Sequence, residues 1–436
     1  MVTIRLKEGV MKGSSNAALW AATVGFFIGF GSVSLFGPTA HLFKDIMRLT
    51  PTDIGFLVAI PMLTGSLLRI PFGAWVDSTG GRLPFLILLI ASLIGLVGLF
   101  YMLKVLYPEH LTHADYPWLL LFGALAGCGI ATFSIGIGQV SYWFPQNRQG
   151  WALAAYAGFG NTSPGLVALI VPAITAAFGL WVSYLVSAAI LVAGLIFYFI
   201  LGLNAPFFQF RKAGMTYDAA VTRARDKEQE LFPKGNPLVT LWKSAVHWKT
   251  WPLVILYFTT FGGFLALTAW FPVYWRSFYN VPVMEAVGLT AGFSLFSALI
   301  RVPGGLWADR FGGESVAILS LLVLLVGAVI MTISQTFAWS VIGEVLIGAG
   351  MGVNNAAVFK LVPLYVPDYV GGTSGWVGGL GALGGFAVPP LLGYFVAKQG
   401  SVGYAHGMVV YVVLAVISLL LAVLLRQVRP KEALPA

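Results

Sequence analysis

Long runs of apolar residues, separated by short polar segments, extend along almost the whole chain. Twelve of these runs are long enough to cross a bilayer, since a spanning helix needs roughly 20 mostly apolar residues. We therefore expect an all-α membrane protein with twelve transmembrane helices, and no cleaved signal peptide, because the first run is itself a full span. The predicted spans are Leu19–Ala40, Ile54–Val76, Leu83–Lys104, Tyr116–Val140, Gly150–Ala177, Leu180–Leu203, Trp251–Tyr274, Met284–Ala308, Ser315–Ser334, Phe337–Leu361, Gly371–Ala397 and Tyr404–Arg426.

One long hydrophilic segment, Asn204–Lys249, divides the chain near its middle. It separates six predicted spans from another six. We expect an N-terminal six-helix bundle over residues 1–203, a cytoplasmic linker loop over 204–249 and a C-terminal six-helix bundle over 250–436. The charged part of the loop, Tyr217–Leu231, predicts a short surface helix.

Composition agrees with a chain that lies in a lipid bilayer. Charged residues make up 9% of the sequence, whereas soluble proteins have roughly 25%. The net charge of +9 does not indicate nucleic-acid binding, because 17 of the 25 Lys and Arg residues fall on one side of the predicted topology and five on the other. Basic loops stay in the cytoplasm. We therefore expect a multi-pass protein of the cell's inner (plasma) membrane with both termini cytoplasmic.

The two halves of the chain share an internal repeat. Arg69–Asp77 (RIPFGAWVD) matches Arg301–Asp309 (RVPGGLWAD), and each is followed, after two intervening residues, by a Gly-Gly pair. A weaker match pairs Gly150–Pro164 with Gly375–Pro389. Chance similarity between apolar segments accounts for shared Leu and Gly, but not for Arg, Pro, Trp and Asp at fixed spacing. Two similar sets of six spans in the same orientation form the parallel repeat of major facilitator transporters, which rock around a substrate between the halves.

The loops after the second and eighth spans resemble the loop signature of the major facilitator superfamily. Asp77 and Arg82 flank the first Gly-Gly pair, and Asp309 and Arg310 precede the second. We interpret each loop as a tight turn in which a carboxylate near a helix end pairs with an arginine and biases a gate. A plain interfacial turn is the alternative.

Arg69 and Arg301 lie inside spans, where a central charge costs roughly 2.5–3.5 kcal/mol and therefore indicates function. The repeat places them at equivalent depths, facing each other between the halves, and no Asp or Glu of these spans is placed to neutralise them. A guanidinium is planar and matches a planar oxyanion with paired N–H donors. We therefore predict an anionic substrate. In the alternative, each arginine pairs with backbone carbonyls or extends to the cytoplasmic face.

Two longer regions resemble the nitrate signatures of the nitrate/nitrite porter family. The first contains GCGIATF at 127–133, YWFP at 142–145 and AGFGNTSPG at 157–165. The second is GAGMGVNNAAVFKLVP at 348–363, followed by GGLGALGG at 378–385. The resemblance covers nearly the whole chain and implies transport of nitrate, nitrite or both. It implies that Arg69 and Arg301 clamp the anion and that four other residues complete the site: Asn161, Phe133, Tyr257 and Phe261.

The spacing of these four residues adds to the resemblance. Tyr257 and Phe261 are four residues apart, so they share one face of a helix. Asn161 is a mid-span amide, which must find hydrogen-bond partners. Pro164 departs from the usual small-residue run and predicts a kink in the fifth span. Without the resemblance, Phe133, Tyr257 and Phe261 are more simply interpreted as packing residues.

The energy coupling is the least determined feature. Two arginines in an empty site repel each other, so we favour nitrate/nitrite antiport. The alternatives are nitrate/proton symport, in which Glu344 is the only carboxylate well inside a predicted span, and a carrier for another small anion. Lys360, near the cytoplasmic end of its span, either extends to the surface or attracts anions. We expect a monomer without enzymatic activity, metal or cofactor. A transporter-like sensor that signals through the 204–249 loop is a further alternative.

Overall fold

The computed structural model describes residues 11–233 and 236–428, and within them the chain forms helices and no strand. Twelve helical segments are long and apolar enough to cross a membrane, so the predicted all-α, twelve-span architecture is confirmed. Some cations used to predict the orientation lie outside the described residues, namely Arg5, Lys7, Lys234, Arg429 and Lys431. The twelve segments are Ser15–Met47, Pro51–Thr79, Arg82–Leu106, His113–Trp143, Asn147–Phe178, Leu180–Leu201, Thr250–Tyr279, Val283–Phe311, Gly313–Ile333, Phe337–Tyr365, Pro367–His406 and Val409–Gln427.

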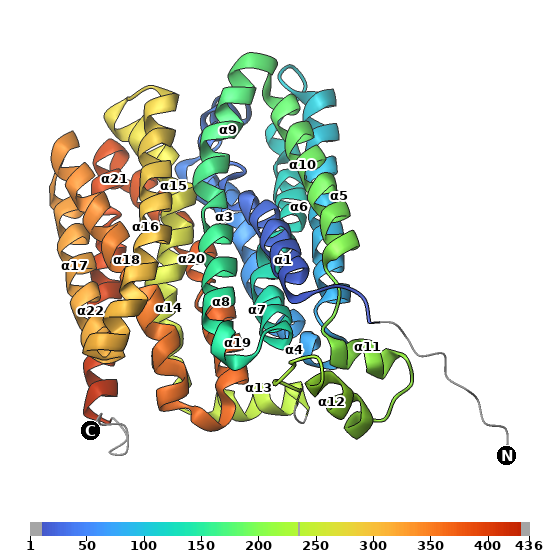
Figure 1. The fold of residues 1–436 in the computed structure, drawn as a ribbon. Coiled ribbons are helices and arrows are strands. Elements are labelled where there is room, and N and C mark those ends of the chain that lie inside the picture. The colour runs from blue at the N-terminus through green and yellow to red at the C-terminus, as the bar shows by residue number, and fades with distance from the viewer. Residues whose placement is uncertain (1–10, 234–235, 429–436) are drawn as a thin grey trace.

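Several of the first six spans consist of two consecutive helices rather than one. The breaks fall in the first, second, fourth and fifth spans (Figure 1). The helices are α1 (Ser15–Phe30), α2 (Ala40–Met47), α3 (Pro51–Leu67), α4 (Arg69–Thr79), α5 (Arg82–Leu106), α6 (Tyr116–Gly127), α7 (Thr132–Trp143), α8 (Gln146–Asn161), α9 (Ser163–Phe178) and α10 (Leu180–Leu201).

Three short helices form most of the connection between the sixth and seventh spans, and the last six spans follow. The charged part of the connection forms a helix, as predicted, although it ends six residues earlier than expected. The remaining helices are α11 (Pro206–Lys212), α12 (Tyr217–Arg225), α13 (Pro237–Val246), α14 (Thr250–Tyr257), α15 (Gly263–Tyr279), α16 (Val283–Phe311), α17 (Gly313–Ile333), α18 (Phe337–Tyr365), α19 (Val370–Leu380), α20 (Gly384–Gln399), α21 (Gly403–His406) and α22 (Val409–Gln427).

The breaks within spans have identifiable causes. Span five changes from α8 to α9 at Thr162, and Pro164 at the start of α9 has no N–H to continue the α8 ladder. A break in the helix therefore lies where the kink was predicted. Span four passes through a 3-10 turn at Cys128–Ala131, and span seven through a π-helical turn at Phe258–Gly262. Such interruptions leave backbone carbonyls without their usual intrahelical partners.

The two halves touch backbone to backbone at the end of the molecule away from Ser15 and Gln427. A Cβ added to Gly37 would lie 2.3 Å from the carbonyl oxygen of Ala269, which belongs to the seventh span. The second and eleventh spans meet in the same way, since a Cβ on Gly55 would lie 2.5 Å from the carbonyl oxygen of Pro389. These contacts close this end of the interface between the halves.

Candidate functional site

Arg69 is the first residue of α4 and is fully buried. Its Nε donates to the carbonyl oxygen of Gly65 at 3.1 Å, and its two terminal nitrogens donate to the carbonyls of Gly378 at 3.2 Å and Ile130 at 3.4 Å. All three acceptors lie at or near interruptions: the end of α3, the 3-10 turn of span four and the end of α19. Carbonyls at helix C-termini carry partial negative charge, so they stabilise the buried cation.

The backbone pairing that we considered as an alternative is therefore present at Arg69. It does not use up the side chain, because a guanidinium has five N–H donors and three are engaged here. The bond to Gly378 also joins the two halves of the chain, since α4 belongs to the second span and α19 to the eleventh. Arg69 thus bridges the halves while keeping two N–H donors for a ligand.

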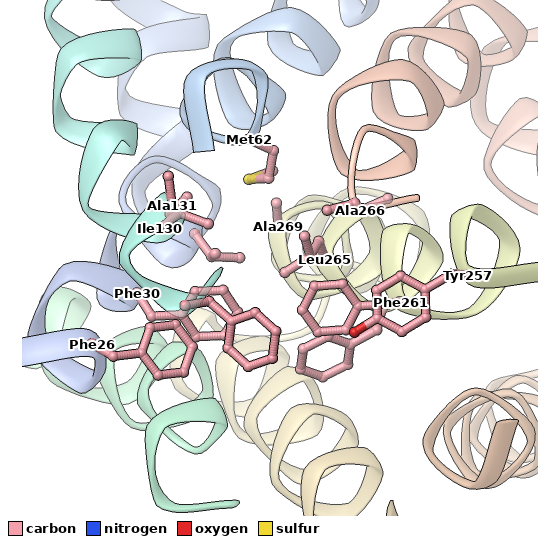
Figure 2. Close-up of a cluster of buried hydrophobic side chains, with 14 of the residues drawn as sticks. Phe26, Phe30, Met62, Ile130, Ala131, Tyr257, Phe261, Leu265, Ala266 and Ala269 are labelled. Atoms are coloured by element: carbon pink, nitrogen blue, oxygen red, sulfur yellow. The ribbon is translucent and has the colours of Figure 1, made fainter. Parts of the chain in front are cut away.

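Two aromatic rings lie against the Arg69 guanidinium, on adjacent sides of it, since their own centroids are 6.2 Å apart. Its central carbon lies 5.0 Å from the ring centroid of Phe133 and 5.1 Å from that of Phe261. Phe261 stacks on Tyr257 with centroids 4.8 Å apart, so the predicted shared face is confirmed. Figure 2 shows this stack facing Phe30 of α1, whose ring lies parallel to that of Phe261 with centroids 6.5 Å apart. Rings around a desolvated guanidinium exclude water and stabilise its charge.

Arg301 lies in α16 and is half-buried. It is close enough to Arg69 for the two like charges to interact, and the Tyr257 hydroxyl lies within the electrostatic reach of both. That hydroxyl is buried and has no hydrogen bond of acceptable geometry. Among residues 11–233 and 236–428, no carboxylate forms an ion pair with either arginine. The structure therefore brings the two cations together, as the repeat predicted, without an anionic partner from the described chain.

Asn161 is the last residue of α8 and is 3% exposed. Its Nδ2 donates to the carbonyl oxygen of Ala157 at 2.7 Å, which leaves one amide N–H for another acceptor. Its Oδ1 is buried without a partner, as are the hydroxyl of Ser297, one turn before Arg301, and that of Ser66, three residues before Arg69. Neither serine was predicted as a site residue. Ser297 lies four residues before Arg301 on the same face of α16, which is the signal that could have identified it, and Ser66 lies three residues before Arg69.

The carboxylates at the two turns do not pair with the arginines beside them, contrary to our expectation. Asp77 accepts a hydrogen bond from the Tyr142 hydroxyl at 2.7 Å, whereas Arg82 donates to the carbonyl oxygen of Phe199 at 2.7 Å. The turn at Gly80 explains the separation. Gly80 has a φ of +77°, and the Asn204 side chain fills the space where its Cβ would be, so the chain bends sharply before Arg82.

The matching turn at the end of α16 also has different partners from those predicted. Asp309 forms an ion pair with Lys360 of α18, and the guanidinium of Arg310 lies over the Phe311 ring, 5.3 Å from its centroid. Lys360 also donates to the carbonyl oxygen of Ala308 at 2.9 Å. Both interactions join α16 to α18, so this cluster lies within the last six spans and does not bridge the two halves.

Glu344 is buried in α18, away from the arginine pair. The indole N–H of Trp275, near the end of α15, donates to its carboxyl at 3.4 Å. Phe261 lies 14 residues earlier in the same span, roughly 20 Å along the helix axis. Tyr274 interacts electrostatically with Glu344, and the ring of Phe337 packs on Trp275. The structure thus places Glu344 in an aromatic environment near one end of the C-terminal half.

Comparison with known proteins decides the family. The profile of the Major Facilitator Superfamily matches residues 22–291 and 279–436. A probable nitrate/nitrite antiporter, NarK1 of Thermus thermophilus, is 31% identical over 88% of this chain and 85% of its own. This chain belongs to the nitrate/nitrite porter family of the Major Facilitator Superfamily. The predicted resemblance is confirmed, and this porter is a carrier rather than an enzyme.

Other relatives match this porter along most of its length. The probable nitrate transporter NarT of Staphylococcus haemolyticus is 28% identical over 94% of this chain and 96% of its own. The probable nitrate/nitrite transporter NarK2 of Mycobacterium tuberculosis is 26% identical over 86% and 87%. The xylose transporter XylE of E. coli, solved in a partially occluded inward-open conformation, superposes with a TM-score of 0.71 at 13% identity over 96% of this porter and 100% of XylE. That similarity shows the shared fold.

Proposed function

We propose that this porter carries nitrate, nitrite or both by alternating access between two six-helix bundles, residues 1–203 and 250–436, linked by 204–249. We place it in the inner membrane as a monomer with both termini cytoplasmic. The observation that carries the proposal is the pair of the buried Arg69 and the half-buried Arg301, which no described carboxylate neutralises. The relatives named as nitrate or nitrite transporters support the choice of anion.

The donors around the arginines suit a small flat anion. Arg69 has two unused N–H donors, and the Tyr257 hydroxyl, which interacts electrostatically with both arginines, is buried without a hydrogen bond of acceptable geometry. The family resemblance assigns the remaining amide N–H of Asn161 to the same anion. Arg301 supplies a second planar fork. Three oxygens in one plane match such donors, while the rings of Phe133 and Phe261 supply an apolar surface beside Arg69. Phosphates and carboxylated sugars need more room and more polar contacts than these residues offer.

We favour exchange of nitrate for nitrite because of what happens to Arg69 when the halves separate. Separation of α4 from α19 breaks the bond from Arg69 to Gly378, and a hydrogen bond to a charged group contributes about 1.5–3 kcal/mol. A bound anion compensates Arg69 for that loss and screens its repulsion from Arg301. The empty carrier has neither benefit. Reorientation is therefore faster with an anion bound at each step, which is the requirement for antiport.

Proton symport is the second candidate, and the burial of Glu344 favours it. Its carboxyl is 3% exposed and forms no ion pair within the part of the chain that the structure describes. Proton-coupled carriers usually have such a residue inside a span. In antiport, by contrast, Glu344 only accepts hydrogen bonds within the C-terminal half, and its charge is not needed for turnover.

Uptake of labelled nitrate into proteoliposomes distinguishes the two mechanisms. We expect uptake into vesicles loaded with nitrite or nitrate, little uptake into empty vesicles, and no dependence on a pH gradient. We also expect Glu344→Gln, which keeps the size of the side chain, to retain exchange. Uptake into empty vesicles that follows the pH gradient and is lost in Glu344→Gln would establish symport. Equal uptake of phosphate in competition with nitrate would refute the choice of substrate.

A further inference from the structure

Helix α13 lies across the ends of the spans on the side that we propose to be cytoplasmic, in the connection between the halves, and packs on α19 and α4 (Figure 1). Its inner face is closely fitted to α19. The indole N–H of Trp376 donates to the carbonyl oxygen of Leu241 at 3.0 Å, and a Cβ on Gly372 would lie 2.6 Å from the carbonyl oxygen of Thr240. Ser244 on the same face is fully buried. The helix is therefore held in a defined orientation.

The outer face of α13 is apolar and faces away from the protein. Leu238, Trp242 and Val246 follow one another at intervals of four residues, so they form one stripe along the helix. Their exposed fractions are 67%, 73% and 71%, and Val239 beside them is 47% exposed. Four large apolar side chains on one surface helix are unusual in water, where such a patch marks an interaction site.

Position and charge identify what covers this face. Only three residues separate Val246 from Thr250, where the seventh span begins, so the helix lies within roughly 10 Å of the bilayer-crossing segment. Lys243 is exposed beside the apolar stripe, and residues 236–250 contain no Asp or Glu. Trp is enriched at membrane–water interfaces, and basic residues there attract anionic headgroups.

The preceding helix, α12, is an internal comparison. It is equally short and lies in the same connection, but its exposed residues are mostly polar and include Asp218, Arg223 and Arg225. Its buried residues Ala220 and Ala224 face the protein. Such a helix is suited to water on its outer side. The outer face of α12 is therefore suited to water, whereas that of α13 is suited to apolar surroundings.

We propose that α13 docks on the cytoplasmic leaflet as an interfacial helix, with Leu238, Trp242 and Val246 in the headgroup–acyl boundary and Lys243 among anionic headgroups. Helix α13 contacts both α4 of the second span and α19 of the eleventh. Binding of α13 to lipid therefore fixes a helix that bridges the two halves. This inference does not depend on which anion the porter carries. It concerns a surface that lies outside the arginine site.

Site-specific fluorescence in nanodiscs tests the docking. Cys128 is the single cysteine and is buried, so Cys128→Ala provides a background for labelling at introduced cysteines. An environment-sensitive bimane is attached in Trp242→Cys and, separately, in Val246→Cys, which reports on the same face if one variant folds poorly. Ala219→Cys on the exposed side of α12 is the matched control.

We expect both α13 labels to show blue-shifted emission, quenching by lipids with a shallow doxyl group and loss of quenching by iodide in water. The α12 label should show the reverse. Replacing anionic lipids with zwitterionic ones should reduce the difference, and so should Lys243→Glu. If iodide quenches the α13 labels as strongly as the α12 label, the face is in water and the proposal is wrong.

Discussion

Changing Arg69 to Lys keeps the positive charge but removes the planar fork. In the structure, the fork reaches carbonyls of three different segments while retaining two N–H donors that point elsewhere. An ammonium group has three donors on one atom and cannot satisfy separated acceptors and a bidentate anion together. We expect the backbone carbonyls to compete with the anion for the lysine, so that anion binding loses at least one charge-assisted hydrogen bond.

The expected magnitude follows from that one bond. A hydrogen bond to a charged group contributes about 1.5–3 kcal/mol, which corresponds to a roughly 10- to 150-fold increase in the nitrate concentration for half-maximal uptake. We expect Arg301→Lys to show a loss of similar size, because Arg301 supplies the second fork. The measurement is initial nitrate uptake into nitrite-loaded proteoliposomes over a range of nitrate concentrations.

Arg225→Lys is the matched control for this measurement. Arg225 lies on the exposed surface of α12, over the ring of Phe232, and has no contact with the site. The control should transport like the unmodified porter, and thermal unfolding should confirm that each variant is folded. If Arg69→Lys and Arg301→Lys both retain the half-saturating concentration within about twofold, too little for even the weakest such bond, the arginines do not bind the substrate.

Two further changes test how the ends of the molecule are held. Gly37→Ala places a methyl group against the backbone of Ala269, and overpacking of this kind costs about 1–3 kcal/mol. We therefore expect a lower unfolding temperature. Cysteine-accessibility measurements should also show that the contact between Gly37 and Ala269 is formed less often. Gly158→Ala is its control, since nothing lies within 4 Å of the added carbon, and it should be neutral or slightly stabilising. Lys360→Ala removes the ion pair with Asp309, whose side chains are 38% and 70% exposed. The free energy of unfolding should therefore fall by at most about 1 kcal/mol at low salt, and by less at high salt. A larger fall would show that the pair stabilises the fold more than an exposed ion pair does.

The sequence contained enough information to predict the spans and the arginine pair. Spans are local, because each is a run of mostly apolar residues, and the repeat relates Arg69 to Arg301 without any knowledge of packing. The break in the fifth span agrees with Pro164, which has no N–H to continue the helical ladder, although Pro61 and Pro172 lie inside helices that continue past them. These features depend on residues close together in sequence or on exact internal matches.

The partners of the arginines were not predictable in the same way. The acceptors for Arg69 are carbonyls, which every residue has, and only the packing of spans two, four and eleven selects those of Gly65, Ile130 and Gly378. The predicted pairs of Asp77 with Arg82 and of Asp309 with Arg310 failed for a related reason. A sharp turn at Gly80 separates Asp77 from Arg82, whereas Asp309 and Arg310 are adjacent within α16. In both cases the partner of the carboxylate, Tyr142 or Lys360, approaches from another helix.

The closures at Gly37 and Gly55 limit how this porter can be redesigned or can diverge. Main-chain atoms meet there, so no side chain is available to strengthen or weaken the seal by gradual substitution. Every replacement adds a side chain at a place that has no free space for it. Natural variants and engineered forms that shift the balance between the two orientations should therefore change at contacts between the halves that involve a side chain, such as that of Ile70 with Gly379.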